Sequence, residues 1–362
     1  MPRVIGIDPG TLSISLCGLD DGRVFLDRSI PTAEALESPS VIVSLLESAG
    51  PLDLIAGPSG YGLPLRAARD LTDVDLRIAY LAAEGESGGL RGLGSLMRAL
   101  ASSSLPIVLT PGVVHLASVP AHRKVNRVDM GTADKVCAAA LAAWDQAARR
   151  HCLPSDVGFI LLELGGAFSA AVVVEGGCIV DGVGGSSGPM GARAAGALDG
   201  EVAFLAGAIT KEMLFRGGAA SVAGMEQSSV DDLAAATTDR ARLAWEAFVE
   251  NAVKAVASLT VSAPAVTDVV LSGRAASVAR VRVAVAGRLA TGMRNLSVRH
   301  LAGFASEASH AAQGAALIAD GLAGGRSSAL VDGLGIREAS GTVFDHLHVI
   351  SASAARARLG IT

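Results

Sequence analysis

The chain has 362 residues, of which half are hydrophobic and only 3% aromatic, and its formal net charge is −5. This length is enough for two domains, and the acidic balance argues against a protein that follows the backbone of a nucleic acid. We find no run of about 18 uncharged apolar residues, the length that a membrane-spanning helix needs. The four cysteines are widely spaced and no signal peptide is expected, so we expect a cytoplasmic protein without disulfides.

The first half of the sequence predicts strands and helices in alternation. "DDG" at 20–22 is a hairpin signal between the second and third strands, and Thr132 is placed to cap a long Ala-rich helix. Thr72–Leu81 shows no regular pattern. The expected strands are Val4–Ile7, Ser13–Leu19, Val24–Arg28, Leu52–Ala56 and Pro106–Leu109, and the other expected helices run from Pro39 to Ala49 and over Leu90–Ser102.

The second half starts the same alternation again. "SVDD" at 229–232 has the spacing of a capping box before a helix, and a Gly/Ser-rich loop occupies 182–201. Strands that alternate with helices indicate a layered α/β architecture. The expected strands are Val157–Leu164, Ala170–Val174, Cys178–Asp181, Thr267–Leu271 and Leu296–His300, and the expected helices are Asp239–Leu259, Val278–Leu289 and Ser306–Ala323.

An internal repeat relates the two halves. A shift of 155 residues places 8–24, "DPGTLSISLCGLDDGRV", on 163–179, "ELGGAFSAAVVVEGGCI", without a gap. Asp8 then lies on Glu163, and each copy follows an apolar strand. Two unrelated hairpins that align by chance are the alternative, but we favour duplicated domains that face each other across a cleft.

The turn after the first strand carries the first candidate site. A carboxylate at Asp8 costs desolvation unless a cation offsets it, and Mg²⁺ with a phosphate would do so. The amide of Gly10 and the hydroxyl of Thr11 can meet phosphate oxygens, whereas an ordinary Asp-Pro-Gly turn would leave Asp8 as a cap only. In the second copy, Gly165 and Gly166 either let a phosphate approach the backbone closely or are ordinary turn glycines.

Residues 118–135 concentrate cationic and acidic side chains. Arg123 can offset the charge of a transferring phosphoryl group, and Asp134 or Asp129 can serve as a base or hold a metal-bound water. The place of Asp134 at a helix start also has an ordinary capping explanation. This stretch is therefore a candidate for catalysis, with a structural role as the alternative.

Two other kinds of segment can bind a nucleotide or a substrate. In "DVVLSGRAAS" at 268–277, Ser272, Gly273 and Arg274 can flank a purine base, although a plain β–α turn explains the pattern as well. Polar glycine loops that follow strands, at 57–62 and 184–201, are candidate substrate loops, with ordinary surface loops as the alternative. Their substrate-binding candidates are Ser59, Tyr61, Ser186, Ser187 and Arg193.

Three motifs in this order resemble those of the actin-like ATPase superfamily, which includes sugar kinases, acetate and butyrate kinases and heat-shock chaperone ATPases. "GIDPGT" at 6–11 resembles the first phosphate motif, "ELGGAFS" at 163–169 the second, and "VVLSGR" at 269–274 the adenosine motif. The whole chain is most similar to an uncharacterised family labelled predicted butyrate kinase, over about residues 3–325. Glu163 departs from the aspartate that is usual in the second motif.

The resemblance implies an α/β fold of duplicated RNase H-like domains that flank a central nucleotide cleft. Residues 1–153 and 154–325 would form the two domains, and 326–362 an extension that packs back on the first. The resemblance also implies ATP and Mg²⁺ as cofactors and a small acid, such as butyrate, or an alcohol as phosphoryl acceptor. A homodimer is a further expectation, and neither a nucleic acid nor a membrane is expected as a partner.

The implied site combines the candidates above. Asp8 and Glu163 would hold Mg²⁺ through waters, and the catalytic set would be Asp8, Glu163, Asp134 and Arg123. The phosphates would lie against Gly10, Thr11, Gly165 and Gly166, and adenine against Ser272, Gly273 and Arg274.

Two other functions remain open at this point. A non-catalytic ATP-binding switch of the same fold is one, because Glu163 replaces the usual aspartate. A nuclease is the other, because "GIDPGT" before a strand also resembles the start of RuvC-type resolvases. The acidic pI and the second phosphate-like motif argue against the nuclease.

Overall fold

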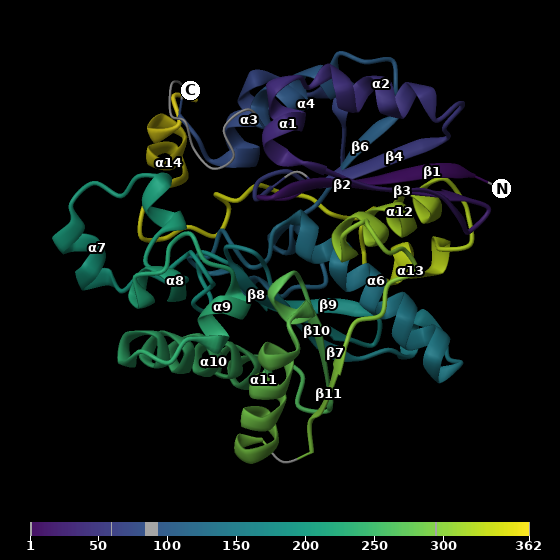
Figure 1. Ribbon diagram of the computed structural model, residues 1–362. Helices are drawn as coiled ribbons and strands as arrows, with labels where there is room; N and C mark the ends of the chain where they lie inside the picture. Colours follow the sequence, from purple (N-terminus) through teal and green to yellow (C-terminus); the bar gives the residue numbers. More distant parts are fainter. Residues whose placement is uncertain (1, 59, 84–92, 294, 362) are drawn as a thin grey trace.

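The computed structural model describes residues 2–58, 60–83, 93–293 and 295–361, and in these ranges the strands form two sheets (Figure 1). The strands of the first sheet are β1 (Arg3–Pro9), β2 (Ser13–Asp20), β3 (Arg23–Pro31), β4 (Leu54–Pro58), β5 (Arg66–Ala67) and β6 (Ile107–Thr110). Those of the second are β7 (Phe159–Leu164), β8 (Ser169–Glu175), β9 (Cys178–Val183), β10 (Asp268–Ser272) and β11 (Ser297–His300).

The two sheets share one topology. Their strand orders are β3-β2-β1-β4-β6-β5 and β9-β8-β7-β10-β11. β1, β2 and β3 form an antiparallel meander, as do β7, β8 and β9. On the other side β1 pairs with β4 in parallel, and β7 pairs with β10 in the same way. The predicted α/β fold with duplicated domains is therefore confirmed.

The register of the strands repeats together with their order. Asp8 and Glu163 lie at matching places near the ends of β1 and β7. In the first meander the pairing shifts after Gly18, and in the second it shifts after Val173, which is 155 residues later. The gapless repeat seen in the sequence is thus also a repeat of backbone geometry, including its irregularity.

Fourteen α-helices occur in the described part of the chain. They are α1 (Thr32–Glu37), α2 (Ser40–Ser48), α3 (Asp73–Tyr80), α4 (Leu93–Ala101), α5 (Ala121–Lys124), α6 (Ala133–Arg150), α7 (Gly200–Ala206), α8 (Ala219–Ala223), α9 (Val230–Ala235), α10 (Asp239–Leu259), α11 (Ala279–Gly292), α12 (His310–Leu322), α13 (Ser328–Gly333) and α14 (Ala352–Arg358).

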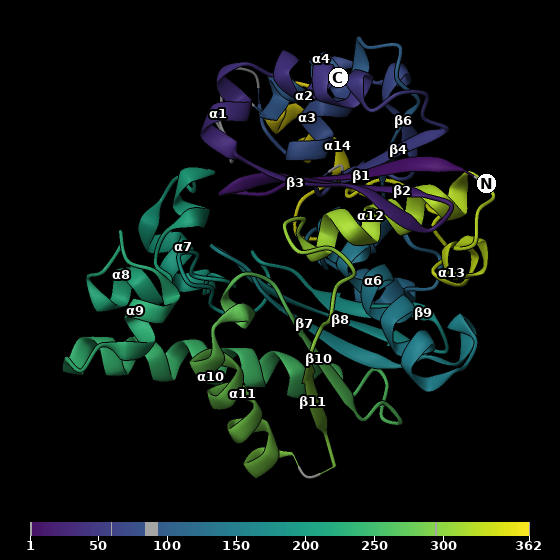
Figure 2. The same cartoon turned by 45° about the vertical axis from the view of Figure 1, so that its right-hand side comes forward.

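Helices and sheets stack in layers, which are clearest in Figure 2. α12 packs on β1, β2 and β4, α6 packs on β8, and the two helices pack on each other, so this pair lies between the sheets. The first four helices lie on the outer side of the first sheet, and α10 covers the outer side of the second. The alternation of side chains along β7 fits this arrangement, since Leu161 joins the core around α6 while Ile160 and Leu162 join the core around α10.

Two glycines let the central helices approach closely. A Cβ on Gly6 of β1 would overlap the backbone of Ala312 in α12, and a Cβ on Gly314 of α12 would overlap the backbone of Cys137 in α6. The small residues that the sequence shows in α12 therefore bring its backbone directly against β1 and α6. As a result, residues at the beginnings of both helices reach the space between the sheets.

The chain after α12 returns to the first half of the sequence. The carboxamide oxygen of Asn126 accepts hydrogen bonds from the backbone amides of His348 and Val349, at 2.7 and 3.0 Å. Arg77 donates to the carbonyl of Gly360 at 2.8 Å. α12 itself packs on the first sheet, although the predicted boundary at 325 groups it with the second domain. The predicted domain boundaries stay a prediction.

The sequence does not predict the helix α3. The segment predicted to be irregular contains α3, which begins with a capping box: Thr72 Oγ1 accepts from the amide of Asp75 at 3.1 Å, and the Asp75 carboxylate accepts from the amide of Thr72 at 2.9 Å. The signal was present as Thr-x-x-Asp, with aspartate in the place that glutamate usually takes. The box predicted at Ser229 and Asp232 is confirmed at the start of α9.

The last predicted helix begins later than expected, at His310 instead of Ser306. The backbone amides of 306–308 donate to the Asp27 carboxylate of β3 at 2.7–3.1 Å, which ties this segment to β3 ahead of the helix. Ser309 is the N-cap and accepts from the amide of Ala312 at 3.1 Å. No described helix has both the length and the apolar character needed to cross a membrane.

Candidate active site

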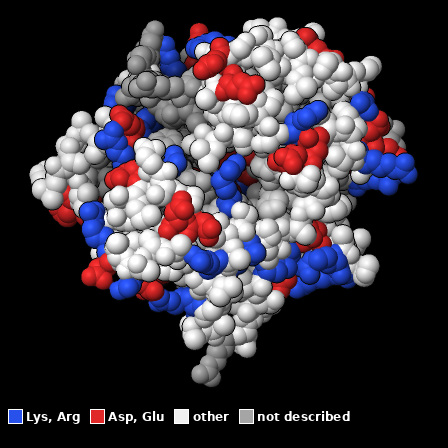
Figure 3. Space-filling view, viewed as in Figure 1, with Lys and Arg blue, Asp and Glu red and all other residues white. Residues whose placement is uncertain are grey.

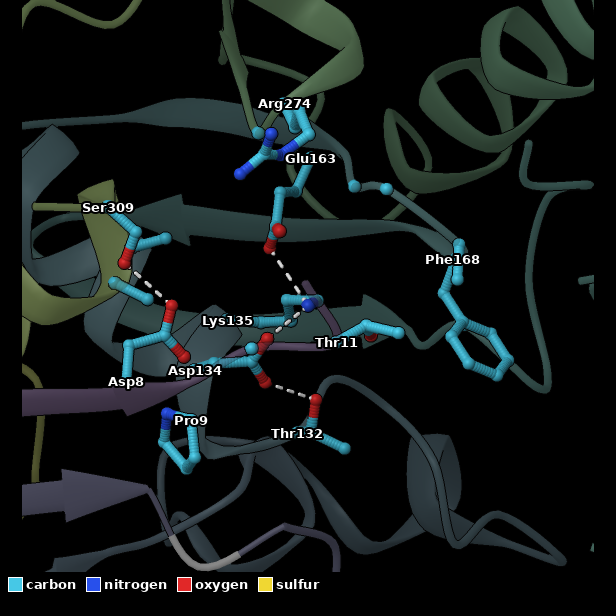
Figure 4. A pocket seen from close by; sticks show the side chains of 18 of the residues that line it. Asp8, Pro9, Thr11, Thr132, Asp134, Lys135, Glu163, Phe168, Arg274 and Ser309 are labelled. Carbon is cyan, nitrogen blue, oxygen red and sulfur yellow. Dashed lines mark hydrogen bonds and ion pairs between the residues drawn. The ribbon is translucent and has the colours of Figure 1, made fainter. Parts of the chain in front are cut away.

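The two repeated turns face one cavity of about 310 Å³ between the sheets. Asp8 and Thr11 line it from the first turn, Glu163 and Gly165 from the second, and Asp134 from the start of α6. Figure 4 shows the side chains of Asp8, Glu163 and Asp134 converging from β1, β7 and α6. The structure therefore brings together groups that are separated by up to 157 positions in the sequence.

Each turn is closed by the same hydrogen bond. The amide of Gly10 donates to the carbonyl of Ser13 at 3.0 Å, and the amide of Gly165 donates to the carbonyl of Phe168 at 2.9 Å. A Cβ on either glycine would lie 2.8 Å from that carbonyl oxygen. Glycine is therefore needed for the turn itself, and a role in binding phosphate would be additional to this.

Asp8 is held by the N-cap of α12. Ser309 Oγ donates to Asp8 Oδ2 at 2.6 Å. Burial, together with the charge of nearby Asp134, raises the pKa of Asp8 to about 6, although the hydrogen bond from Ser309 opposes this rise. Near neutral pH this carboxyl group therefore responds to any cation placed beside it.

Lys135 joins two acidic side chains from different halves of the fold. Its Nζ donates to Asp134 Oδ2 and lies 3.1 Å from Glu163 Oε2, as the dashed lines in Figure 4 show. Thr132 Oγ1 donates to the other oxygen of Asp134. Asp134, Lys135 and Glu163 thus form a chain of alternating charge across the cavity.

The two carboxyl groups of this chain have opposite pKa shifts. Burial raises the pKa of Glu163 to about 7, even though the charge of Lys135 lowers it. Burial also acts to raise the pKa of Asp134, but the charge of Lys135 and the hydrogen bonds from Lys135 and Thr132 lower it below its usual value. Asp134 is therefore the ionised partner of Lys135 at neutral pH, and Glu163 is only partly ionised.

The end of β10 forms another wall of the cavity. Ser272 Oγ lies 2.8 Å from Nδ1 of His310, and Gly273 has a φ of +90° that favours glycine. Burial and the neighbouring His300 lower the pKa of His310 to about 4, so the imidazole is neutral. Arg274 is exposed, and within the described residues its guanidinium makes no hydrogen bond or ion pair, so it remains available to a ligand.

A second cavity of about 360 Å³ continues from the first. The two share Leu12, Gly166 and Arg274, and the second is closed by residues of α9 and by the segment that follows β10. Arg193 lines this second cavity and not the first. The predicted substrate residue Arg193 therefore shares a cavity with Gly166 and Arg274, whereas the other predicted nucleotide residues line the first cavity.

The other loop residues have varied surroundings. Tyr61 lines the first cavity, whereas Ser186 and Ser187 bind Asp129: the amide and the hydroxyl of Ser186 each donate to Asp129 Oδ2 at 2.8 Å. Ser187 Oγ donates to the backbone carbonyl of Asp129. Both hydroxyl groups and the Asp129 carboxylate thus hold the 184–187 loop beside the cavity. Ser59 lies outside the described residues.

Arg123 does not reach the cavity, contrary to its predicted catalytic place. Its guanidinium donates to the carbonyls of Val180 and Ser262, at 2.7 and 3.3 Å, and lies 3.9 Å from the Asp181 carboxylate. These partners belong to β9 and to the segment after α10. Arg123 therefore links α5 to the second sheet, and the sequence pattern that suggested an anion site reflects this link.

The described residues fit a water-mediated magnesium site. Among them no group of three or more His, Cys, Asp or Glu side chains is arranged to hold a metal directly. Mg²⁺ normally keeps several waters and takes only one or two carboxylates. Asp8 and Glu163 offer such oxygens, and Glu163 Oε2 is buried and accepts no hydrogen bond beyond its ion pair. A divalent cation near these two carboxyl groups would lower both raised pKa values.

The sequence predicts no site role for Lys135, Ser309 or His310, all of which line the cavity. Thr132, predicted only as a helix cap, is the N-cap of α6, but its hydroxyl binds Asp134 instead of a backbone amide. Lys135 belongs to the candidate stretch 118–135, but its ion pair with Glu163 depends on how α6 crosses β7. Ser309 lies within a predicted helix whose start, at Ser306, is four residues before the observed one. Recognising Ser309 as an N-cap would have been the signal for it.

Charged side chains of both signs are interspersed on the face of the molecule seen in Figure 3. That face shows no continuous basic track, which a nucleic-acid backbone would require. Together with the net charge of −5, this gives no support to the nuclease interpretation.

Comparisons with known proteins agree on the fold. A propionate kinase from Francisella tularensis has a TM-score of 0.62 at 14% identity, over 87% of this chain and 99% of that chain. An acetate kinase from Entamoeba histolytica has a TM-score of 0.59 at 12% identity, over 80% and 86%. A putative N-acetylmannosamine kinase from Listeria monocytogenes has a TM-score of 0.51 at 13% identity, over 87% and 97%. At these identities the likeness shows the actin-like ATPase fold alone.

The profile of a protein family described as "Protein of unknown function (DUF1464)" matches residues 6–349. A search of curated proteins found no match.

Proposed function

The chain belongs to the DUF1464 family, whose description names no activity. From its site, we propose that it is an ATP-dependent phosphotransferase acting on a small acid or alcohol. The observation that carries this proposal is the pair of repeated glycine turns, which bring Asp8 and Glu163 to one cavity that continues past Arg274 into a second. The acetate, propionate and N-acetylmannosamine kinases that share this fold support the proposal.

ATP would occupy both cavities. Its phosphates would lie against the backbone of Gly10, Gly165 and Gly166 and the hydroxyl of Thr11, at the junction of the two spaces. Adenosine would lie in the second cavity, which Arg274, Ala275 and the residues of α9 line, while Ser272 and Gly273 line the first cavity beside the phosphates. Arg274 lines both spaces and is exposed, so its guanidinium can pair with phosphate oxygens.

Asp8 and Glu163 would hold Mg²⁺ through waters. When bound, the ion would neutralise phosphate charge that builds up during transfer. The remaining work of the chain is positioning: Ser309 orients Asp8, and Lys135 keeps Glu163 and Asp134 at a fixed spacing. Of the two predicted bases, Asp129 is hydrogen-bonded to Ser186 of the 184–187 loop, so Asp134 is the better candidate.

ATP consumption against a panel of small acids and alcohols tests this proposal, together with calorimetric titration of ATP in the presence and absence of Mg²⁺. We expect ATP to bind with Mg²⁺ and an acceptor to stimulate ADP formation. Asp8→Asn should lose turnover by at least about 100-fold because it removes a carboxylate from the metal side. Full activity in that variant would remove Asp8 from the mechanism.

Other outcomes would favour the alternative functions. ATP binding without transfer to any acceptor would favour a nucleotide-sensing switch. Binding to junction DNA that falls steeply with salt would favour a nuclease. A cytoplasmic location and a homodimer belong to the same proposal, and cell fractionation and light scattering test them.

A further inference from the structure

We propose that the phosphoryl acceptor is a neutral compound that carries a hydroxyl group, and that Asp134 takes the proton from this hydroxyl. The inference rests on the phosphotransferase function proposed above and narrows its acceptor from "acid or alcohol" to alcohol. Three features of the first cavity carry it: its balance of charge, the surroundings of Asp134 and the concentration of aromatic side chains.

The first cavity is rich in carboxylates and poor in free cations. Of the described residues that line it, four are acidic and two, Lys135 and Arg274, are cationic. Lys135 is already paired with Asp134 and Glu163. Arg274 borders the second cavity as well, and in Figure 4 it lies beside Glu163, with Lys135 between it and Asp134. On the Asp134 side, the described residues leave no unpaired cation to bind the carboxylate of an acid.

The geometry of Asp134 suits a proton acceptor. Thr132 Oγ1 donates to Oδ1 and Lys135 Nζ donates to Oδ2, so both oxygens are fixed in place. Each carboxylate oxygen can accept a further hydrogen bond. The side chain is about one quarter exposed, which leaves it accessible from the cavity. A hydroxyl group can donate to it, whereas a carboxylate acceptor has no proton to give and would be repelled.

The transfer step balances with these groups. The acceptor oxygen forms a bond to the γ-phosphorus, and the bond from that phosphorus to the β–γ bridging oxygen breaks, which releases ADP. The acceptor O–H bond breaks, and its proton passes to an oxygen of Asp134. Lys135 and Thr132 act as positioning residues, because they hydrogen-bond to the two oxygens of Asp134.

Aromatic side chains gather at this cavity although they are rare in the chain. The sequence contains two tyrosines, and both of them, Tyr61 and Tyr80, line the cavity. Phe168 and Phe215 also line it and contact each other edge to face, with ring centroids 4.8 Å apart. Flat apolar surfaces of this kind pack against the C–H face of a neutral carbon skeleton. The cavity thus offers an apolar surface together with the fixed carboxylate of Asp134.

Matched pairs of acceptors test the inference: glycerol with glycerate, glucose with gluconate, and 1-butanol with butyrate. ADP formation is measured for both members of each pair, and the product is treated with hydroxylamine, which converts acyl phosphates to hydroxamates and leaves phosphate esters intact. We expect ADP formation with at least one neutral member and a product that resists hydroxylamine. A hydroxamate as the main product would overturn the inference and leave the phosphotransferase proposal standing.

Asp134→Asn provides a second readout. It should lower kcat for the hydroxyl acceptor by about 10²- to 10⁴-fold, the usual contribution of a general base, while the affinity for ATP stays within a few-fold. Asp239→Asn on the exposed surface of α10 is the matched control and should leave kcat unchanged. Unchanged kcat in Asp134→Asn would remove this residue as the base. If neither member of any pair forms ADP, both the inference and the proposed phosphotransferase fail.

Discussion

Replacing Glu163 by glutamine should stabilise the ligand-free protein, and the gain should depend on pH. Burial raises the pKa of Glu163 from 4.5 to about 7 in the folded state. In the unfolded chain the pKa of this carboxyl group is near 4.5. Between pH 4.5 and pH 7 the group is therefore ionised in the unfolded state but still mostly protonated in the folded state. The free energy of unfolding therefore falls as the pH rises through this window, and the full cost is present above pH 7.

The size of the effect follows from this shift. A difference of about 2.5 pH units at 1.36 kcal/mol per unit gives about 3 kcal/mol as the cost of keeping Glu163 in the fold at pH 8. The ion pair with Lys135 is already included, since the charge of Lys135 lowers this pKa. Glutamine has nearly the same shape and no charge to desolvate. Glu163→Gln should thus gain about 3 kcal/mol at pH 8 and well under 1 kcal/mol near pH 4.5.

Urea unfolding followed by circular dichroism, without nucleotide or metal, measures this difference at pH 8 and pH 5. Glu226→Gln, at an exposed glutamate, is the control and should follow the wild type at both pH values. Asp8 also titrates in this range, and because its charge contributes to the raised pKa of Glu163, this repulsion is part of the difference measured. A variant that is less stable than the wild type at pH 8, or equally stabilised at both pH values, would refute the reasoning.

Three other predictions concern the same region. Mg²⁺-dependent ATP binding should strengthen from pH 5.5 to pH 8, as Asp8 and Glu163 ionise with pKa values of about 6 and 7, and calorimetry checks this. Ser309→Ala should cost about 1 kcal/mol by removing the cap of α12, and it should move the pH midpoint of activity upward, because the lost hydrogen bond no longer lowers the pKa of Asp8. Gly314→Ala should lower the stability by about 2 kcal/mol or more because its Cβ meets the α6 backbone, whereas Gly287→Ala, at an open position of α11, should raise it by up to about 1 kcal/mol; equal urea midpoints would contradict this.

The duplicated fold could be predicted because its repeated turns depend on residues that are close together in the sequence. Asp8 and Glu163 are each preceded by a buried strand and followed by glycine, since the turn hydrogen bond leaves no room for a Cβ at Gly10 or Gly165. Such requirements act within a few residues, and both copies have to meet them. The repeat therefore survived in a recognisable form even though few identities remain.

The electrostatic connections of the site could not be predicted in the same way. Lys135 meets Glu163 only because α6 lies between the sheets, and Ser309 meets Asp8 only because α12 returns to β1. These contacts join residues that are far apart in the chain, and no local spacing encodes them. Arg123 shows the reverse: its local pattern resembled an anion site, but its long-range partners are backbone carbonyls.

The acidic residues of the two turns have different partners, because α6 and α12 lie between the sheets. The start of α6 supplies Thr132, Asp134 and Lys135, and its N-terminus, which favours negative charge, faces the cavity. Lys135 is within reach of the longer side chain of Glu163, whereas Asp8 is bound by the hydroxyl of Ser309. The glutamate in the second copy therefore has a physical reason that the repeat alone does not reveal: its extra methylene group extends the carboxylate toward the ammonium group of α6. Glu163→Asp should weaken this contact while keeping the charge, so a drop in activity comparable to that of Glu163→Gln would indicate that the length of the side chain matters as much as its charge.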